Sequence, residues 1–429
     1  MDCDVIISGG GPSGLMAAKR CAELGLKVIL VDLKKDIYRY TRPCCAMWMT
    51  EPDYHNENYS FQKNKIIFQK NNFSVPYNGA IVDLKRSVRL STKGRAVTVV
   101  KKGSVVAKVI DKEALLKGLF DGVVKSGVNV RNQTVSIGAE ENGKGVRLKV
   151  IHKGKTSFVT GKVLLAADGV NSKIVENLGY NKNRKMIFDT NVVSYHMINV
   201  KTQYYDSWVR FTGTDFTGVG GGSMLPKPLK DSDVPCLAVY APPVDFKKIS
   251  EKDIMKKFFE HPVVKDWFEG AKVIERLACR WTVWGPIKRP ATGKIILVGD
   301  SAAFQEVENQ GALMCGFRAA NAVRDELEGK KGFEDYNSFW QESFEFNDRN
   351  KVEESCRGAW FRNLNDEEID YLYSLLEGEA IDGYINHFES GSKLLQILDK
   401  KIDRIKKERP EIARLMESFY NLAPEDFFS

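Results

Sequence analysis

Apolar and polar positions alternate along the first thirty residues in a way that predicts strands and a helix. Val5–Ser8 is an apolar run of strand length, Leu15–Leu24 has apolar residues at helical spacing, and Lys27–Val31 is a second apolar run. A strand, a turn, a helix and a strand in this order are typical of a parallel sheet. The pattern therefore predicts an α/β fold from the N-terminus onward.

Two later segments repeat the theme of a buried strand that ends in glycine or an acid. GKVLLAADGVNSKIVENLG spans residues 161–179, and residues 293–323 contain the strand GKIILVGD, a polar loop and a helix that we expect to open near Gly311. In a parallel sheet the carboxyl ends of the strands lie along one edge. We therefore expect the three strand ends to converge on one crevice.

The rest of the chain divides into strand-rich and helical stretches. Residues 60–100 and 185–245 alternate and are rich in Val, Tyr, Phe and Thr, which predicts strands that together form a substrate-side sheet. From residue 331 onward the pattern is helical and of mixed charge. The predicted architecture is a discontinuous cofactor domain of residues 1–70, 104–180 and 290–330, a mainly antiparallel substrate domain of residues 71–103 and 181–289, and a C-terminal helical region of residues 331–429.

Composition narrows the class of protein. With 429 residues, of which 43% are hydrophobic and 28% charged, the chain has the composition of an ordinary soluble globular protein that can bury a deep site. No apolar run reaches the roughly 18 residues needed to span a bilayer. Acidic rather than basic residues precede the first strand, unlike in a signal peptide, so we expect a cytoplasmic protein.

Charge and cysteine usage exclude further classes. Eight cysteines without a CxxC pair indicate neither a zinc site nor a secreted disulfide framework, so we expect no metal. The net charge of +8 favours anionic partners, but 64 basic against 56 acidic residues is typical of a mixed surface, and we expect no nucleic-acid partner. The basic face of residues 393–419 leaves peripheral contact with an acidic membrane open, although a solvated helix is the better interpretation.

The turn between the first strand and the first helix carries a dinucleotide-binding motif. Gly9, Gly11 and Gly14 form GxGxxG, whose glycines let backbone amides approach a pyrophosphate at the positive end of the helix. Asp32 follows the second strand and can accept hydrogen bonds from ribose hydroxyls. In this context the motif favours a dinucleotide site over a glycine turn that only packs a helix on a sheet.

The order GxGxxG, Asp168-Gly169 and Gly299-Asp300 resembles the FAD-binding group of flavoprotein monooxygenases and their relatives. The resemblance implies a Rossmann-type FAD-binding domain in which Asp300 bonds the ribityl chain and the amides near Gly311 face the N1/O2 edge of the flavin. Lys112 lies where the family often has an arginine near the cofactor, although a solvated lysine at a helix start is the plainer interpretation. The implied FAD site comprises Gly9, Gly11, Pro12, Ser13, Gly14, Asp32, Lys112, Asp168, Gly169, Gly299, Asp300, Gly311, Ala312 and Leu313.

Within that group, Pro43-Cys44-Cys45-Ala46 resembles the Pro-x-Cys-Gly segment of the geranylgeranyl reductase branch, whose members saturate prenyl double bonds. RWTVWGPIKRPATGKIILVGD and the C-terminal helical region fit the same branch. Cys45 matches the cysteine of the branch, so the resemblance implies a catalytic thiol that points toward the flavin and acts as a proton donor or positioning group. Cys44 is expected to face the interior as a small hydrophobe.

Two departures from the branch bear on the substrate. The glycine of the branch is replaced by Ala46, and the bulk of Met47 and Trp48 is expected to narrow a tunnel near the flavin. FQEVENQG replaces an apolar, proline-containing loop and brings Glu306 and Glu308 near the flavin ring. These acids suggest a polar or cationic substrate or a proton donor, with a solvent-facing loop as the alternative.

Two activities on a small-molecule substrate fit the resemblance. The first is FAD-dependent reduction of carbon–carbon double bonds in a prenyl-type or other hydrophobic compound. The second is a monooxygenase, a hydroxylase or less readily a halogenase, that acts through a flavin C4a-hydroperoxide. No second dinucleotide fold is visible, so the electron donor is NAD(P)H bound transiently, ferredoxin or another carrier, the last two being redox partner proteins. The sequence specifies neither this choice nor the oligomeric state.

Overall fold

The first sheet is built around β1 (Cys3–Ser8) in the computed structural model, which describes residues 1–228, 235–357, 364–386, 388 and 390–419. β1 pairs in parallel with β2 (Val28–Val31) on one side and with β14 (Lys155–Ala166) on the other. Such strands are apolar along their length because both faces are covered. The sheet is extended by β11 (Asn129–Arg131), β12 (Thr134–Asn142), β13 (Gly145–His152), β20 (Ala291–Thr292) and β21 (Ile295–Leu297). The α/β fold predicted from the sequence is confirmed.

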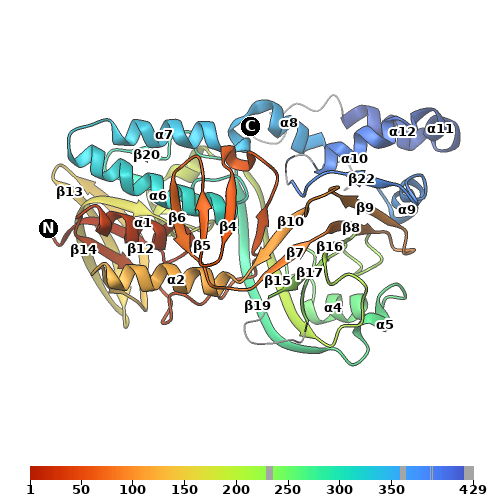
Figure 1. Cartoon of the computed structure of the whole chain (residues 1–429), viewed down its shortest axis with the longest axis horizontal. Helices are drawn as coiled ribbons and strands as arrows, with labels where there is room; N and C mark the ends of the chain where they lie inside the picture. The colour runs from red at the N-terminus through yellow and green to blue at the C-terminus, as the bar shows by residue number, and fades with distance from the viewer. Residues whose placement is uncertain (229–234, 358–363, 387, 389, 420–429) are drawn as a thin grey trace.

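Two long helices pack on this sheet and on each other at glycines, where no side chain separates the backbones. α1 (Pro12–Glu23) begins with proline, and α6 (Glu308–Leu327) lies beside it (Figure 1). A Cβ at Gly14 would lie 1.8 Å from the carbonyl oxygen of Gly9, and a Cβ at Gly316 would lie 2.3 Å from that of Ser13. Glycine is therefore required at both positions, because α1 contacts the strand turn below it and α6 beside it at backbone distance.

The second sheet has eight strands in the order β19-β15-β18-β17-β16-β8-β9-β22, with mostly antiparallel pairs. Its strands are β8 (Arg86–Leu90), β9 (Ala96–Val100), β15 (Met186–Ile198), β16 (Ser207–Phe211), β17 (Ser223–Lys227), β18 (Cys236–Tyr240), β19 (Lys272–Trp284) and β22 (Ala380–Asp382). One face packs on α4 (Glu251–Glu260) and α5 (Lys265–Phe268), while the other contributes Trp208, Leu225 and Tyr240 to the core shared with the first sheet.

The prediction that residues 60–100 join this sheet is wrong for its first part. β4 (Tyr59–Gln62), β5 (Lys65–Phe68) and β6 (Phe73–Pro76) form a separate sheet, and β7 (Ile81–Leu84) joins a third with β3 (Met47–Met49) and β10 (Ala107–Ile110). The fully buried Trp48 explains the separation, because its ring lies edge-on to Tyr59, Phe61 and Phe68 at centroid distances of 5.3, 5.4 and 5.9 Å.

The C-terminal part of the described chain is mainly helical, as predicted. Its helices are α7 (Gly332–Ser343), α8 (Arg349–Arg357), α9 (Asp366–Ser374), α10 (Ser390–Asp399), α11 (Ile402–Glu408) and α12 (Pro410–Phe419), and the last ten residues of the chain lie outside the described part. In Figure 1, α9 to α12 lie at the end of the molecule that is distant from α1. The helical pattern over 393–419 is divided among α10, α11 and α12, with one break after Asp399 and a second before Pro410, which lacks an N–H for the helix.

Basic side chains of this region pair with acids, for example Lys401 with Glu379 at 2.7 Å and Lys406 with Glu417 at 3.0 Å. This pairing agrees with a solvated helical surface. Among the residues that the structure describes, no helix combines the length and the apolar character that crossing a bilayer demands.

The close approach of α1 and α6 predicts that Gly316→Ala is destabilising. Because the added methyl group would meet backbone atoms of α1, the two helices must separate, and we expect a loss of about 1–3 kcal/mol and a lower Tm in thermal unfolding. Gly143→Ala is the control, since a Cβ there has no neighbour within 4 Å. Equal Tm values for the two variants would contradict the required contact.

Candidate active site

One cavity of about 140 Å³ lies at the start of α1, against the Cys44–Met49 segment and the start of α6. The three strand ends converge on it as expected, because Gly11 follows β1, Gly169 follows β14 and Asp300 follows β21. The predicted site residues that line it are Gly11, Pro12, Ser13, Cys45, Lys112, Gly169, Asp300 and Ala312.

The remaining predicted residues lie outside the lining of this cavity. They are Gly9, Gly14, Asp32, Asp168, Gly299, Gly311 and Leu313. Asp168 accepts a hydrogen bond from the Ser172 hydroxyl at 2.7 Å, and Leu313 is fully buried in the core. The structure therefore gives these two residues local packing contacts.

The helix that was expected to open near Gly311 begins three residues earlier, at Glu308. Gln310 lies inside the first turn, where its side chain accepts a hydrogen bond from Met49 N at 3.3 Å and donates one to Met49 O at 3.2 Å. Gln310 belongs to the polar stretch that suggested a loop, but its side chain is hydrogen-bonded within the core. It is therefore compatible with a buried helix start. The first amides of α6 belong to Glu308 and its neighbours rather than to Gly311, Ala312 and Leu313.

The start of α1 fits the pyrophosphate of a dinucleotide. The N-terminus of α1 has no side-chain cap and no acidic residue in its first turn, so its positive end is uncompensated. Gly11 has open space where a Cβ would be, and its neighbours Pro12 and Ser13 also face the cavity. Backbone amides at an uncapped helix start bind anionic phosphates, so these residues fit FAD.

Asp32 and Asp300 each accept backbone hydrogen bonds that fix the loops beside the cavity. Asp32 is 7% exposed and accepts hydrogen bonds from Gly10 N at 2.6 Å and from Lys34 N at 2.7 Å, which fixes the carboxylate beside the glycine turn. Asp300 accepts a hydrogen bond from Val307 N at 2.9 Å. Asp300 therefore also closes the loop that carries Glu306.

Cys44 makes polar contacts that the sequence did not predict. Its Sγ accepts hydrogen bonds from Lys112 Nζ at 3.1 Å and from Ala46 N at 3.3 Å. Burial opposes ionisation of this thiol, but the charges of Lys112 and Lys227 outweigh it and lower the pKa of Cys44 below its ordinary value. The expectation of a small interior hydrophobe is wrong, because the start of the helix α2 (Lys112–Lys125) brings an ammonium group to the sulfur.

The pKa of Cys45 is shifted in the opposite direction to that of Cys44. Burial and the adjacent Cys44 raise the pKa of Cys45 to about 12, so its thiol stays protonated, in agreement with the expected neutral form. Tyr240 holds the turn by donating a hydrogen bond to the Cys44 carbonyl at 2.7 Å, and Lys227 donates one to the Cys45 carbonyl at 3.2 Å. Neither Tyr240 nor Lys227 carries a motif, so sequence reasoning missed both.

Strand alternation settles the placement of the two bulky residues after Ala46. Met47 and Met49 line the cavity, while Trp48 points to the opposite side of β3 and packs on aromatic rings there. The expectation that Trp48 narrows a tunnel near the flavin is therefore wrong, whereas Met47 does face that space. The wall formed by the two methionines is apolar and adaptable.

Glu306 is the one carboxylate lining the cavity for which the described residues provide neither a hydrogen bond nor an ion pair. Its side chain lines the cavity and is exposed there, yet the surrounding protein desolvates the carboxylate and raises the pKa of Glu306 well above its usual range, with Asp300 and Glu308 adding to the effect. Glu306 thus lines the cavity and is also accessible to solvent.

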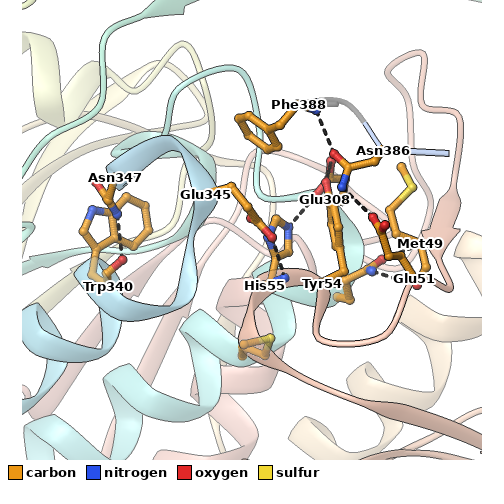
Figure 2. Close-up of polar contacts among 12 residues, drawn as sticks. Met49, Glu51, Tyr54, His55, Glu308, Trp340, Glu345, Asn347, Asn386 and Phe388 are labelled. Carbon is orange, nitrogen blue, oxygen red and sulfur yellow. Dashed lines mark hydrogen bonds and ion pairs between the residues drawn. The ribbon is translucent and has the colours of Figure 1, made fainter. Parts of the chain in front are cut away.

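Glu308 is held in a buried cluster with His55 and Glu345 (Figure 2). His55 is fully buried, and its Nε2 and Nδ1 lie 2.6 Å from carboxylate oxygens of Glu308 and Glu345. Tyr54 donates a hydrogen bond to Glu308 at 3.0 Å. His55 and Glu308 both have left-handed backbone, with φ of 59° and 50°, so the cluster holds two strained turns in place.

The charge of His55 follows from these contacts. Burial alone would lower the pKa of the imidazole, but the two carboxylates outweigh it and raise the pKa of His55 to about 10. The carboxylate of Glu308 is therefore paired with the positively charged imidazole of His55, whereas Glu306 has no such partner among the described residues. His55 and Glu345 are 290 residues apart, which explains why no sequence pattern indicated the cluster.

Comparisons with known proteins agree with the fold and the cavity. A family described as FAD binding domain matches residues 4–38. The chain is 25% identical over 389 residues to a digeranylgeranylglycerophospholipid reductase of Methanocaldococcus jannaschii, covering 89% of this chain and 92% of that protein.

Two solved structures share the fold. A geranylgeranyl bacteriochlorophyll reductase-like protein from Thermoplasma acidophilum has a TM-score of 0.66 at 18% identity, covering 97% of this chain and 99% of that one. A p-nitrophenol 4-monooxygenase from Pseudomonas putida has a TM-score of 0.56 at 11% identity, covering 97% and 98%.

Fold, cavity and comparisons together define an FAD-dependent oxidoreductase. The resemblance to the geranylgeranyl reductase branch is supported by this digeranylgeranylglycerophospholipid reductase, to which 89% of the chain is similar.

The buried His55 predicts that stability falls at alkaline pH. Its pKa in the folded state, about 10, lies above the value of 6.5 expected when unfolded, so its contribution is complete below pH 6.5 and is lost as the pH rises through 10. His55→Gln should cost about 3 kcal/mol at pH 7, with the difference from wild type shrinking toward pH 10, in Tm measured against pH. The exposed His152→Gln should keep the wild-type profile; an unchanged profile in His55→Gln would contradict the charged cluster.

The two adjacent thiols should differ in reactivity. At pH 7 iodoacetamide should alkylate Cys44 at least about tenfold faster than Cys45, because the thiolate is the nucleophile. Peptide mass spectrometry of the protein without cofactor measures both rates. Lys112→Met should slow the alkylation of Cys44 and shift the pH dependence of that rate to higher pH. Faster alkylation of Cys45 than of Cys44 in the wild-type protein would show that Lys112 does not activate Cys44.

Proposed function

We propose that the protein reduces carbon–carbon double bonds of a prenyl-type or other hydrophobic substrate. The observation that carries the proposal is the position of Glu306, a carboxyl without a partner among the described residues, in the same cavity as the residues that would hold FAD and the apolar Met47 and Met49. Reduction of a double bond needs a hydride at one carbon and a proton at the other. FAD in its reduced form supplies the hydride when bound.

FAD would be held by side chains and amides along the edge of the first sheet. The amides at Gly11, Pro12 and Ser13 would bind the pyrophosphate, Asp32 the adenosine ribose and Asp300 the ribityl chain. Lys112 lies on the same cavity beside Cys44, where its charge would favour an anionic reduced cofactor. The name of the relative from Methanocaldococcus jannaschii supports a prenyl lipid as the substrate class.

Glu306 would donate the proton to the second carbon of the double bond. Its pKa is raised by burial, which keeps the acid protonated at a pH where an ordinary glutamate is ionised. Cys45 lines the same cavity and is the alternative donor, but a pKa of about 12 is less well matched to proton transfer near neutral pH. Cys45 would then act by positioning the substrate.

A monooxygenase is the second candidate, supported by the fold shared with the p-nitrophenol 4-monooxygenase. The two activities differ in their product. Mass spectrometry of a geranylgeranyl lipid incubated with dithionite-reduced holoprotein should show a gain of two hydrogen atoms per reduced bond without O₂. A product that gains oxygen, and forms only in air, would favour the monooxygenase.

The proton donor is tested by comparing Glu306→Gln with Cys45→Ser. Glu306→Gln should slow anaerobic turnover of the geranylgeranyl lipid by about 10²–10⁴-fold, the range for loss of a general acid, while FAD content measured by absorbance stays near that of wild type. Cys45→Ser should lose less than about tenfold. A large loss in Cys45→Ser with full activity in Glu306→Gln would transfer the role to the thiol.

A further inference from the structure

A buried cluster of three ionisable side chains lies beside the cavity and takes no part in the proton transfer proposed above. Glu308 lines the cavity, His55 is fully buried, and the Glu345 side chain, bonded to the other nitrogen of the ring, is 13% exposed (Figure 2). The three residues belong to the first turn of α6, to η1 (Tyr54–Asn56) and to η4 (Glu345–Asn347). The cluster therefore joins three separate segments at the start of α6.

The hydrogen bonds of His55 fit an imidazolium between two carboxylates. Nε2 lies 2.6 Å from a Glu308 oxygen, and Nδ1 lies 2.6 Å from a Glu345 oxygen. A neutral imidazole has a single N–H, so it could donate to only one of two ionised carboxylates. With two negative charges and one positive charge, the cluster keeps a net negative charge.

The neighbouring groups agree with this distribution of protons. Burial opposes ionisation of Glu345, but the charge of His55 outweighs it and lowers the pKa of Glu345 below its usual value. Burial and the carboxylate of Glu308 raise the pKa of Tyr54 well above its usual range, so its hydroxyl stays protonated and donates to Glu308 at 3.0 Å. The Glu308 carboxylate thus accepts hydrogen bonds from a phenol and from an imidazolium.

Gly311 lets the His55 ring rest against the first turn of α6. A Cβ at Gly311 would lie 2.8 Å from Phe344 Cε1 and 3.1 Å from His55 Cδ2. Both distances are shorter than an ordinary van der Waals contact, so a side chain at Gly311 would displace the two rings. The cluster is therefore packed directly on the helix start, which fixes Glu308 beside the cavity.

The two helix starts at the cavity differ in charge. The first turn of α1 has no acidic residue, whereas the first turn of α6 carries Glu308. A carboxylate at a helix N-terminus offsets the positive end of the helix dipole. The start of α1 therefore suits a pyrophosphate, while the start of α6 is less favourable to any further negative charge.

The ionisable groups that line the cavity are mainly acids. They are Asp300, Glu306, Glu308 and the thiols of Cys44 and Cys45, with Lys112 as the cation of the lining. Lys112 donates a hydrogen bond to the Cys44 sulfur at 3.1 Å, so its charge compensates that thiol. The charge of Glu308 is instead compensated by His55, which lies outside the lining of the cavity.

We propose that Glu308 lowers the reduction potential of bound FAD through the charge that it carries at the start of α6. With its pyrophosphate at the start of α1, FAD would place its flavin end in the part of the cavity that α6 lines. Reduction adds negative charge to the cofactor, and a carboxylate nearby opposes this addition. The inference goes beyond the proposed function, because it concerns the cofactor and requires no particular substrate.

The test measures the reduction potential of the FAD-loaded, full-length protein without substrate. Dithionite is added in the absence of O₂ at pH 7 together with a reference dye of known potential, and absorbance gives the ratio of reduced to oxidised FAD. At a fixed dye potential, Glu308→Gln should raise this ratio by about tenfold, as for loss of a nearby unit charge in a partly polar site. A tenfold change corresponds to about 30 mV for a two-electron couple.

Two matched variants separate the charge of Glu308 from its structural contacts. Glu308→Asp keeps a carboxylate but is too short for the contact with His55, and it should leave the ratio within about threefold of wild type. Glu345→Gln removes a carboxylate that bonds the same ring but lies outside the cavity lining, so it should also change the ratio by less than about threefold. Both variants should lower the Tm, because each disturbs the cluster.

An unchanged ratio in Glu308→Gln would refute the inference. Equal shifts in Glu308→Gln and Glu308→Asp, or in Glu308→Gln and Glu345→Gln, would refute it as well, because they would indicate a structural disturbance rather than the charge of Glu308. Failure of the proposed function looks different: the shift in Glu308→Gln would be observed, but no hydrogen would be added to a geranylgeranyl lipid under anaerobic reduction.

Discussion

The contact of bare backbone at the start of α1 is the constraint on which the rest of the site depends. Gly14 lets the helix rest on the Gly9 carbonyl, and Gly316 lets α6 rest on the Ser13 carbonyl, so two helices and the end of β1 meet without intervening side chains. This closeness leaves the positive end of α1 uncapped and facing the cavity. It also brings the loop after β21, with Asp300 and Glu306, to the same space.

Ionisable residues of the same type in and around the cavity differ in the partners that their side chains contact. Glu308 is bonded to the imidazolium of His55, and Asp300 accepts a backbone hydrogen bond, whereas Glu306 has neither kind of partner in the described chain. The two thiols also differ in their partners, because Lys112 donates a hydrogen bond to the sulfur of Cys44 and not to that of Cys45. The two neighbouring thiols thus have opposite tendencies to hold a proton, because the pKa of Cys44 is lowered and that of Cys45 is raised.

The cavity has two walls of different polarity. The wall from the first sheet presents amides and charged groups, while Met47 and Met49 are apolar.

The sequence by itself determined the α/β fold, the convergence of three strand ends, the resemblance to the geranylgeranyl reductase branch and the FAD cofactor, because these follow from short segments whose periodicity and glycines act locally. Tertiary structure alone decided which cysteine ionises, since Lys112 and Cys44 meet only when α2 packs on the Cys44–Met49 segment. It also turned Trp48 away from the cavity through the alternation of β3, and joined His55 to Glu345 across 290 residues.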